Sequence, residues 1–338
     1  MPAHFGIDIS SNSIKVAEAK NVGNGYELQA FGEVRTPASL QSSNSQDEGL
    51  IAKSIKQLIR DSGIKNRNVY MALPENQVYT RVIQLPLLKE EELKNALKFE
   101  AEQYVPIPID EVFLEYQTLY APPPDIKGAK MEVLIVAARK TIVEKLTRIA
   151  QMADLTPLVA ETSLLATLRA VKEQMGDFSM LVDLGNSSTD IAIIQSGNVK
   201  QVSSIPTAGH ALTRAVAQAL SLPEQQARQY KHTYGLEEDQ LEGKVARAME
   251  EPITIIVNHI EKNVRFAKEL SKDGSINQVV ISGGTALLPN LTFYLVDKIG
   301  IEVNLANPLQ ACINENLPSQ LVAAGPRFAS VIGLAIRD

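Results

Sequence analysis

The sequence predicts an α/β protein of two lobes, each with a core of sheet and helices, plus a small α-β-β-α insert subdomain in the first lobe. One observation is a repeated pattern of strand, small polar turn and strand, found at His4 to Lys20 and again at Met180 to Ser196. Runs of this kind, split by Gly, Asn and Ser, are typical of buried β-hairpins. A second observation is the length of 338 residues, which is too long for one ordinary core. Together they indicate two similar halves that face each other across a cleft.

The turns of the two hairpins contain residue types that bind phosphate. The hairpins align without gaps, and Asp8 in the first strand falls on Asp183. Backbone N–H groups and hydroxyls of small turn residues bind phosphate oxygens, and strand-end carboxylates suit a water-bridged Mg²⁺ ion. We therefore predict a nucleotide site with Asp8 and Asp183 as magnesium carboxylates. The predicted phosphate-binding residues are Ser10, Ser11, Asn12, Ser13 and Lys15 in the first hairpin, and Gly185, Asn186, Ser187, Ser188 and Thr189 in the second.

The first lobe is predicted to span residues 1–84 and 154–178, with a C-terminal helix at 326–338 packing back on it. Its hairpin start differs from the glycine-rich strand-to-helix turn of a dinucleotide-binding fold, which disfavours that fold. An amphipathic helix begins at Asp47 or Glu48 and is stopped by Gly63. The further predicted elements are strands at Tyr26 to Arg35, Asn68 to Leu73, Val78 to Leu85 and Thr156 to Ala160, and a helix at Glu161 to Glu173.

Residues 85–153 are predicted to form the insert subdomain. Its first helix, Lys89 to Tyr104, has an acidic first turn, which suits the positive end of a helix. Leu93, Leu97 and Ala101 form an apolar stripe along this helix, and one small sheet would not cover all of it. We therefore predict a partner groove at this stripe, unless the stripe packs against the chain's own first lobe. The insert is completed by strands Val112 to Tyr120 and Lys130 to Ala138 and a helix at Lys140 to Ala153.

The second lobe is predicted to span residues 179–325. Its strand Val199 to Ile205 leads to a turn that ends in Gly209. A later apolar strand, Ile276 to Ile281, leads directly into Gly283, Gly284 and Thr285. Two adjacent glycines after a buried strand let the backbone approach a flat ligand closely. Helices are predicted at His210 to Leu220, from Pro223 to Tyr234, across Glu237 to Leu270, and after Leu291.

The composition excludes several classes of function. The net charge is −6 and no cluster of Lys and Arg is interleaved with aromatic residues, so we expect no nucleic-acid partner. The single cysteine, Cys312, excludes an intramolecular disulfide and a Cys-based zinc site, and the four histidines lack metal-ligand spacing. No apolar run approaches the ~20 residues that span a bilayer, so we expect no direct membrane insertion. Any membrane contact is expected to come through a partner.

The order of turns resembles that of the actin, hexokinase and heat-shock chaperone ATPase superfamily, so an actin-like ATPase fold is implied. Within it, the chain is most similar to the PilM family of type IV pilus assembly proteins and to the related FtsA family. The most specific similarity lies in the insert, at Arg81 to Pro86, Glu90 to Leu93, Phe99 to Pro106 and Val136 to Arg139. Two positions depart from the family pattern, because Ser10 and Ala208 stand where glycines are usual.

The resemblance implies ATP and Mg²⁺ as cofactors. Gly283 and Gly284 would flank adenine, with Thr285 and Leu288 beside them, and Lys231 would lie near the ribose. Lys15 and Lys231 are each also compatible with a solvated lysine. The implied partner is the N-terminal cytoplasmic tail of a PilN-like single-span membrane protein, which would hold this protein in the cytoplasm at the inner membrane of a pilus or a related secretion or competence system. Self-association is left open.

For catalysis, the sequence offers one candidate residue. Glu161 is the one candidate for positioning water near a γ-phosphate, and it also suits the start of a helix. We expect an ATP-binding protein with slow or no turnover. One alternative is an FtsA-like filament protein, although the sequence ends at Arg337 and Asp338 without the basic amphipathic helix of that family. The other is a small-molecule kinase of the superfamily, which would need a substrate-side carboxylate base.

Overall fold

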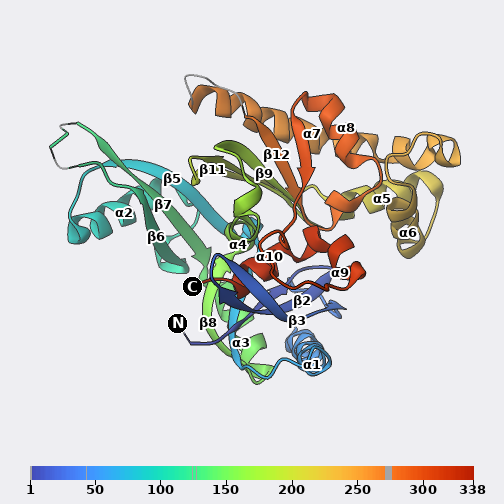
Figure 1. The fold of residues 1–338 in the computed structure, drawn as a ribbon, viewed down its shortest axis with the longest axis horizontal. Coiled ribbons are helices and arrows are strands. Elements are labelled where there is room, and N and C mark those ends of the chain that lie inside the picture. Colours follow the sequence, from blue (N-terminus) through green and yellow to red (C-terminus); the bar gives the residue numbers. More distant parts are fainter. Residues whose placement is uncertain (1, 43, 124, 127, 271–275) are drawn as a thin grey trace.

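The computed structural model describes residues 2–338 except 43, 124, 127 and 271–275 (Figure 1). Within these ranges the strands form two five-stranded sheets and one three-stranded sheet. The five-stranded sheets are the cores of the two lobes. The three-stranded sheet lies to one side of both, at the left of Figure 1. The predicted α/β class with two lobes and an added subdomain is confirmed.

The two large sheets have the same topology. The first has the order β3-β2-β1-β4-β8 and the second the order β11-β10-β9-β12-β13. In each, three antiparallel strands are followed by two parallel ones. The strands of the first are β1 (Phe5–Ile9), β2 (Ser13–Val22), β3 (Gly25–Arg35), β4 (Asn68–Leu73) and β8 (Thr156–Thr162), and those of the second are β9 (Phe178–Leu184), β10 (Thr189–Gln195), β11 (Asn198–Ile205), β12 (Gln278–Ser282) and β13 (Glu302–Leu305). The duplicated hairpins are therefore equivalent parts of two equivalent sheets.

Helices cover both faces of the first sheet because alternate strand residues are apolar on both sides. One face packs against α1 (Ser45–Asp61) and α3 (Lys140–Met152), with Ile7 among its buried residues. The other face packs against α4 (Ser163–Ala170) and α10 (Gly325–Ala335), with Ala17 and Tyr70 buried there. The second lobe is covered by α5 (Gly209–Leu220), α6 (Glu224–Tyr234), α7 (Lys244–Leu270) and α8 (Leu291–Ile299), and α9 (Ser319–Ala323) precedes α10.

Helices α4 and α10 cross at the seam between the lobes. A Cβ atom on Gly333 of α10 would lie 1.7 Å from the carbonyl oxygen of Ala166 in α4, so only glycine permits this crossing. Ala329 of α10 and Leu164 of α4 belong to one buried cluster with Val280 of β12. The seam thus joins both sheets through closely packed small residues.

The insert is a sheet of order β5-β7-β6 with one helix packed on it. Its elements are β5 (Val78–Pro86), α2 (Glu90–Tyr104), β6 (Val112–Tyr120) and β7 (Lys130–Arg139). Two elements differ from the predicted division. Strand β5 was assigned to the first lobe, but it pairs with β7 along its whole length. Helix α3 was assigned to the insert, but its Leu146 and Ile149 pack into the first-lobe core. The domain boundaries as a whole stay a prediction.

Candidate functional site

A cavity of about 990 Å³ lies between the two lobes. Its volume is at the upper end of the range for ligand pockets. Both duplicated turns line it, and the residues after β12 lie beside them. The predicted residues that line it are Asp8, Ser10, Ser11, Asn12, Ser13, Lys15, Asp183, Gly185, Asn186, Ser187, Ser188, Lys231, Gly283, Gly284 and Thr285, whereas Thr189, Gly209 and Leu288 do not. The two halves of the sequence therefore form one site.

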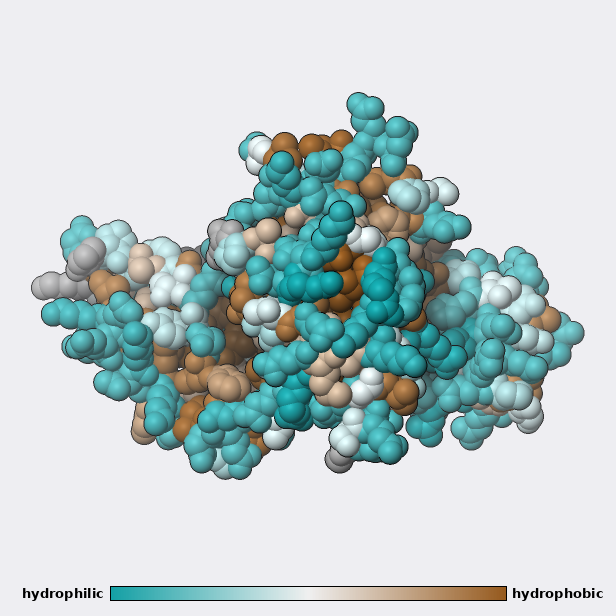
Figure 2. All heavy atoms as spheres, turned by 90° about the horizontal axis from the view of Figure 1, so that it is seen from below, coloured by the Kyte–Doolittle hydropathy of each residue, from teal (hydrophilic) through white to brown (hydrophobic). Residues whose placement is uncertain are grey.

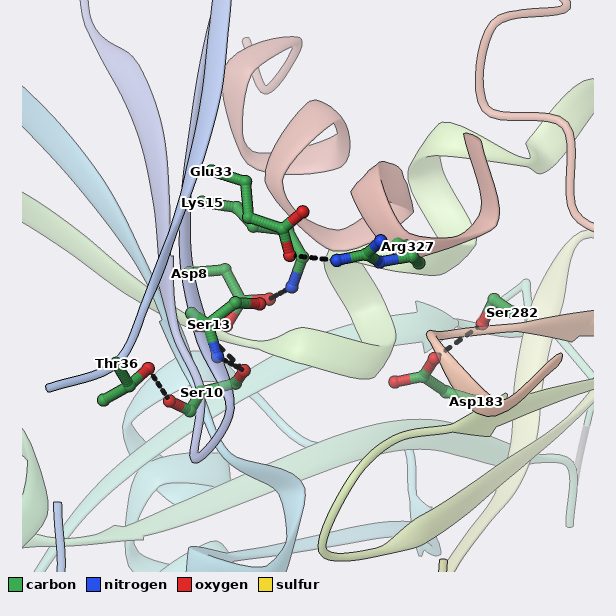
Figure 3. A network of polar contacts seen from close by, with 9 residues as sticks. All are labelled: Asp8, Ser10, Ser13, Lys15, Glu33, Thr36, Asp183, Ser282 and Arg327. Atoms are coloured by element: carbon green, nitrogen blue, oxygen red, sulfur yellow. Dashed lines mark hydrogen bonds and ion pairs between the residues drawn. The ribbon is translucent and has the colours of Figure 1, made fainter. Parts of the chain in front are cut away.

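The first turn is held in shape by its own side chains (Figure 3). Ser10 Oγ donates a hydrogen bond to the carbonyl oxygen of Ser13 at 2.9 Å, and Thr36 Oγ1 donates to that of Ser10 at 2.7 Å. Lys15 Nζ lies 3.9 Å from a carboxylate oxygen of Asp8. Burial raises the pKa of Asp8, and the Lys15 ammonium opposes this rise. Lys15 is itself only 7% exposed, so the alternative of a solvated lysine is wrong.

Asp183 lies across the cavity from Asp8 (Figure 3). Ser282 Oγ donates a hydrogen bond to its carboxylate at 2.8 Å. Burial raises the pKa of Asp183, and the negative charge of Asp8 raises it further. The two carboxylates thus repel each other across the cavity, a repulsion that a bound cation would relieve. Among the described residues, no group of three or more His, Cys, Asp and Glu gathers into a metal cage.

The two turns also contact each other directly. Ser11 Oγ lies 2.7 Å from Ser187 Oγ, and Asn186 Nδ2 donates to Ser11 Oγ at 3.0 Å. A third contact crosses from α6, where Arg228 donates a hydrogen bond to Asn12. A ligand that enters between the turns would have to replace these bonds. They are the same polar groups that were predicted to bind phosphate.

The glycine turn after β12 requires glycine for a geometric reason. Gly283 has φ of +86°, and its Cβ would lie 2.4 Å from the carbonyl oxygen of Leu184. The neighbouring Thr285 Oγ1 donates to the carbonyl oxygen of Gly185 at 2.7 Å, which ties this turn to the second phosphate turn. The turn that follows β12 therefore packs directly against the end of β9.

Lys231 and Gly209 are hydrogen-bonded to each other beside the cavity. Lys231 Nζ donates to the carbonyl oxygen of Gly209 at 2.9 Å, and the side chain is only 3% exposed. Burial lowers the pKa of Lys231 to about 8, and the nearby Arg228 guanidinium lowers it further. The alternative of a solvated surface lysine is therefore wrong. Gly209 has no room for a side chain, because a Cβ would lie 2.5 Å from Thr285 Oγ1.

Seven charged residues line this cavity without having been predicted from the sequence: Arg35, Glu75, Lys145, Asp190, Glu224, Arg228 and Arg327. Arg327 at the start of α10 forms an ion pair with Glu33 of β3 (Figure 3). Asp190 could have been found from the sequence, because it occupies the position of Lys15 in the alignment of the two hairpins. The other six lie outside the duplicated segments, so no local pattern marks them.

Glu75 and Asp190 are buried acids. Burial raises the pKa of Glu75 to about 8, and the charge of Asp190 adds to the rise. Thr80 Oγ1 donates to Glu75 Oε1 at 3.0 Å. Burial likewise raises the pKa of Asp190 to about 7, against hydrogen bonds from Ser204 and Ser188 at 2.5 and 2.9 Å. The cavity lining therefore includes two carboxylic acids whose pKa values are raised to about 8 and about 7.

Glu161 does not line the interlobe cavity. Its carboxylate lies 2.5 Å from Arg169 and 2.9 Å from Arg337. These residues line a second cavity of about 700 Å³, together with Tyr116 and Gln117 of β6. The prediction that Glu161 positions water for hydrolysis is therefore wrong for this structure, since its charge is neutralised by two arginines in a different cavity.

The second cavity is a groove between the insert and the first lobe. Residues of β6 form one wall, and the first lobe contributes the β2-β3 turn, α4 and the C-terminal residues. Seen from below, a recess bordered by hydrophobic residues separates the insert, at the left, from the rest of the molecule (Figure 2). The groove walls also carry Arg169, Lys172 and Arg337, with Glu161 and Glu173.

The predicted partner residues Leu93, Leu97 and Ala101 are not exposed in this groove. They are 4%, 1% and 2% exposed and pack against the insert's own strands, for example on Leu85 and Met131. The expectation that one small sheet cannot cover the stripe is therefore wrong. The exposed large apolar residues in the described part of the insert are instead Leu87, Phe99, Tyr104, Phe113, Tyr120 and Ile126.

Comparisons with known proteins agree with this architecture. The family model described as "Type IV pilus assembly protein PilM" matches residues 6–338. A solved "PilM-PilN type IV pilus biogenesis complex" contains a chain with 26% identity and a TM-score of 0.87, covering 99% of this chain and 98% of that one. MreB 5 of Spiroplasma citri bound to AMPPNP, at 11% identity and a TM-score of 0.56 over 98% of this chain and 94% of that one, shows the same fold.

Curated relatives are more distant. Cell division protein FtsA of Bacillus subtilis (strain 168) is 22% identical over 240 residues, which are 62% of this chain and 54% of the relative. Cell shape-determining protein MreB of Escherichia coli (strain K12) is 27% identical over 165 residues, which are 40% of this chain and 48% of the relative. The chain thus spans about half the length of the curated relatives it matches. Because the family model extends over nearly all of its length, the chain belongs to the PilM family of type IV pilus assembly proteins.

Proposed function

We propose that this protein binds Mg·ATP in the interlobe cavity and a short membrane-protein tail in the groove beside the insert. The observation that carries the nucleotide part is the meeting of two duplicated turns in one cavity, with Asp8 and Asp183 on opposite sides (Figure 3). Calorimetry with Mg·ATP tests this part directly. An absence of binding by the wild-type protein would overturn it.

The residues present fit a magnesium ion held partly by water and phosphate. Two carboxylates face each other, and the surrounding donors are hydroxyl and carbonyl oxygens, which are the ligands that Mg²⁺ prefers. When bound, the ion would neutralise phosphate charge. The chain's own contribution is to orient the phosphates through the backbone N–H groups of the turns and the hydroxyls of Ser11 and Ser187, with the side-chain amide of Asn12 beside them. Lys15 supplies a buried positive charge.

The partner part of the proposal concerns the N-terminal cytoplasmic tail of a PilN-like protein. Its support is the similarity to the PilM chain of a PilM-PilN complex over nearly the whole length. The groove itself offers edge strands, because β6 and β8 end the insert sheet and the first sheet, respectively. An extended peptide can bond to such an edge through its main chain. No helix in the described ranges is long and apolar enough to cross a membrane. Attachment to the membrane through this partner is part of the proposal.

Fluorescence anisotropy with a labelled PilN tail peptide tests the groove. Gln117 and Thr118 are both exposed on β6, but of the two only Gln117 lines the groove. Gln117→Arg should weaken binding at least tenfold by filling the groove, whereas the matched Thr118→Arg should leave it unchanged. Equal effects of the two variants would rule out this groove. No binding by the wild-type protein would remove the partner proposal and favour the FtsA-like alternative.

A further inference from the structure

An ion pair links the insert to the second lobe. Lys200 of β11 places Nζ 2.5 Å from a carboxylate oxygen of Glu132 on β7. The two side chains are only 20% and 18% exposed, so this pair is better shielded from solvent than most surface ion pairs. Gln84 Nε2 also faces the Glu132 carboxylate at 3.5 Å. Strands β5 and β11, each at the edge of its own sheet, pack alongside each other here (Figure 1).

At its other end, the insert is anchored in the core of the first lobe. Val78 at the start of β5 is paired with Ala138 near the end of β7, and both side chains belong to the first-lobe core. Glu132 pairs with Gln84 near the opposite end of these strands. The insert sheet is therefore held at one end by the first lobe and at the other end by Lys200 of the second lobe. It bridges the two lobes that enclose the interlobe cavity.

The strand that carries Lys200 is joined by sheet pairing to the nucleotide side of the second lobe, with a register shift at Lys200 itself, between Val199 and Gln201. β11 pairs with β10, whose first residue, Thr189, follows the second phosphate turn. Thr189 Oγ1 also donates to the carbonyl oxygen of Thr207, just beyond β11, at 2.7 Å. A change in the position of that turn relative to the first lobe is thus passed to Lys200 through a hydrogen-bonded sheet.

The groove beside the insert has walls on the two parts that such a movement would separate. Tyr116 and Gln117 belong to the insert, whereas Arg169 and Arg337 belong to the first lobe. If the second lobe moves relative to the first, the Lys200 to Glu132 pair pulls the insert with it, and the distance between the walls changes. Without the pair, the insert keeps its anchor in the first lobe, and only the packing of β5 on β11 still links it to the second lobe.

We propose that the Lys200 to Glu132 ion pair couples occupancy of the interlobe cavity to the groove beside the insert, so that nucleotide and peptide alter each other's affinity. This proposal rests on the proposed function, since it needs a ligand at each site. Such coupling is reciprocal, and typical values are 5- to 150-fold in affinity. The pair acts as a mechanical connection and contacts neither ligand.

The test measures the affinity of a labelled PilN tail peptide by anisotropy with and without saturating Mg·ATP. The wild-type protein should show at least about a fivefold difference between the two affinities. Lys200→Glu and Glu132→Lys should each bring this ratio close to one, while the double variant with exchanged charges should restore most of it. Lys298→Glu, at an exposed position on α8, is the matched control and should keep the wild-type ratio.

The outcomes separate this inference from the proposed function. If the wild-type protein binds neither ligand, the proposed function fails and the coupling fails with it. If it binds both ligands independently, or if Lys200→Glu keeps the full ratio, only the coupling is overturned. Thermal unfolding of each variant shows whether it is folded, and the rescue by charge exchange distinguishes a specific link from general damage.

Discussion

Lys15 and Asp190 occupy the same position in the two duplicated hairpins. Each lies directly across from the strand-end aspartate in the register of its hairpin, Lys15 opposite Asp8 and Asp190 opposite Asp183. The first hairpin therefore pairs opposite charges, and the second places two acids side by side. Burial raises the pKa of Asp190 to about 7, and the charge of the neighbouring Asp183 adds to this rise.

The buried acids predict a pH-dependent stability. Asp190 keeps its proton up to about pH 7 in the folded protein, whereas the unfolded chain loses it near pH 4. The unfolded state thus binds fewer protons between these values, so the free energy of unfolding falls as pH rises. Asp190→Asn should remove this contribution and gain on the order of 1–3 kcal/mol relative to wild type between pH 4 and pH 7.

Urea unfolding at pH 4.5 and pH 7.5 checks this prediction. Asp297→Asn on α8 is an exposed control and should show the same pH dependence as wild type. Glu75→Gln should act in the same direction over a wider range, because the pKa of Glu75 lies at about 8. Parallel pH profiles for wild type and Asp190→Asn would contradict the prediction.

The cavity carboxylates should determine the affinity for Mg·ATP. Asp8→Asn and Asp183→Asn each remove one negative charge while keeping the size of the side chain. Each should weaken binding by ~1.5–3 kcal/mol, the range for loss of a charge-assisted interaction. Calorimetry in excess Mg²⁺ measures this, with Asp297→Asn again as control. Wild-type affinity in both cavity variants would exclude these carboxylates from the site.

Mg·ATP should raise the melting temperature. A ligand that contacts both lobes binds only the folded protein, so stability should grow with the logarithm of its concentration once the sites are filled. At a concentration of 100 times Kd the gain is ~2.7 kcal/mol. Differential scanning fluorimetry over a series of concentrations provides the curve. A flat curve would indicate that Ser10 and Ala208, which stand where the family usually has glycine, leave no room for the nucleotide.

The glycine after β12 should not tolerate a side chain. Gly283→Ala would place a methyl group 2.4 Å from a backbone oxygen at a φ of +86°, so both the turn and its contact with Asp183 would shift. We expect a loss of ~1–3 kcal/mol in stability and at least tenfold weaker Mg·ATP binding. Gly197→Ala is the comparison, since that turn glycine also has positive φ but open space around it. Gly197→Ala should lower the stability but leave Mg·ATP binding unchanged.

The stripe of α2 should behave as a core and not as a binding surface. Leu97→Ala should cost ~2–4 kcal/mol in unfolding free energy, because Leu97 is 1% exposed. Phe99→Ala on the same helix should change stability by less than ~0.5 kcal/mol, since Phe99 is 66% exposed. Chemical denaturation of the two variants compares them directly. A smaller effect of Leu97→Ala than of Phe99→Ala would mean that α2 packs with its other face.

The sequence by itself determined the features that are repeated or local. The duplicated hairpins predicted two equivalent sheets, because a strand, a small polar turn and a strand form a hairpin through contacts within about twenty residues. The same alignment already placed Asp8 and Asp183 in equivalent positions. It also contained Asp190, at the place of Lys15.

The tertiary structure alone decided which partner each apolar face found. The periodicity of α2 and α3 shows that each helix buries one face, but it does not show whether that face meets the insert sheet or the first lobe. Leu97 packs on the insert sheet, although a partner groove was predicted there. Leu146 of α3 packs in the first-lobe core, although this helix was predicted to belong to the insert. The surroundings of charged side chains were also decided by the tertiary structure. Glu161 lies between two arginines, and Glu75 lines the cavity. Long-range packing determines where such a side chain is buried and which charges surround it.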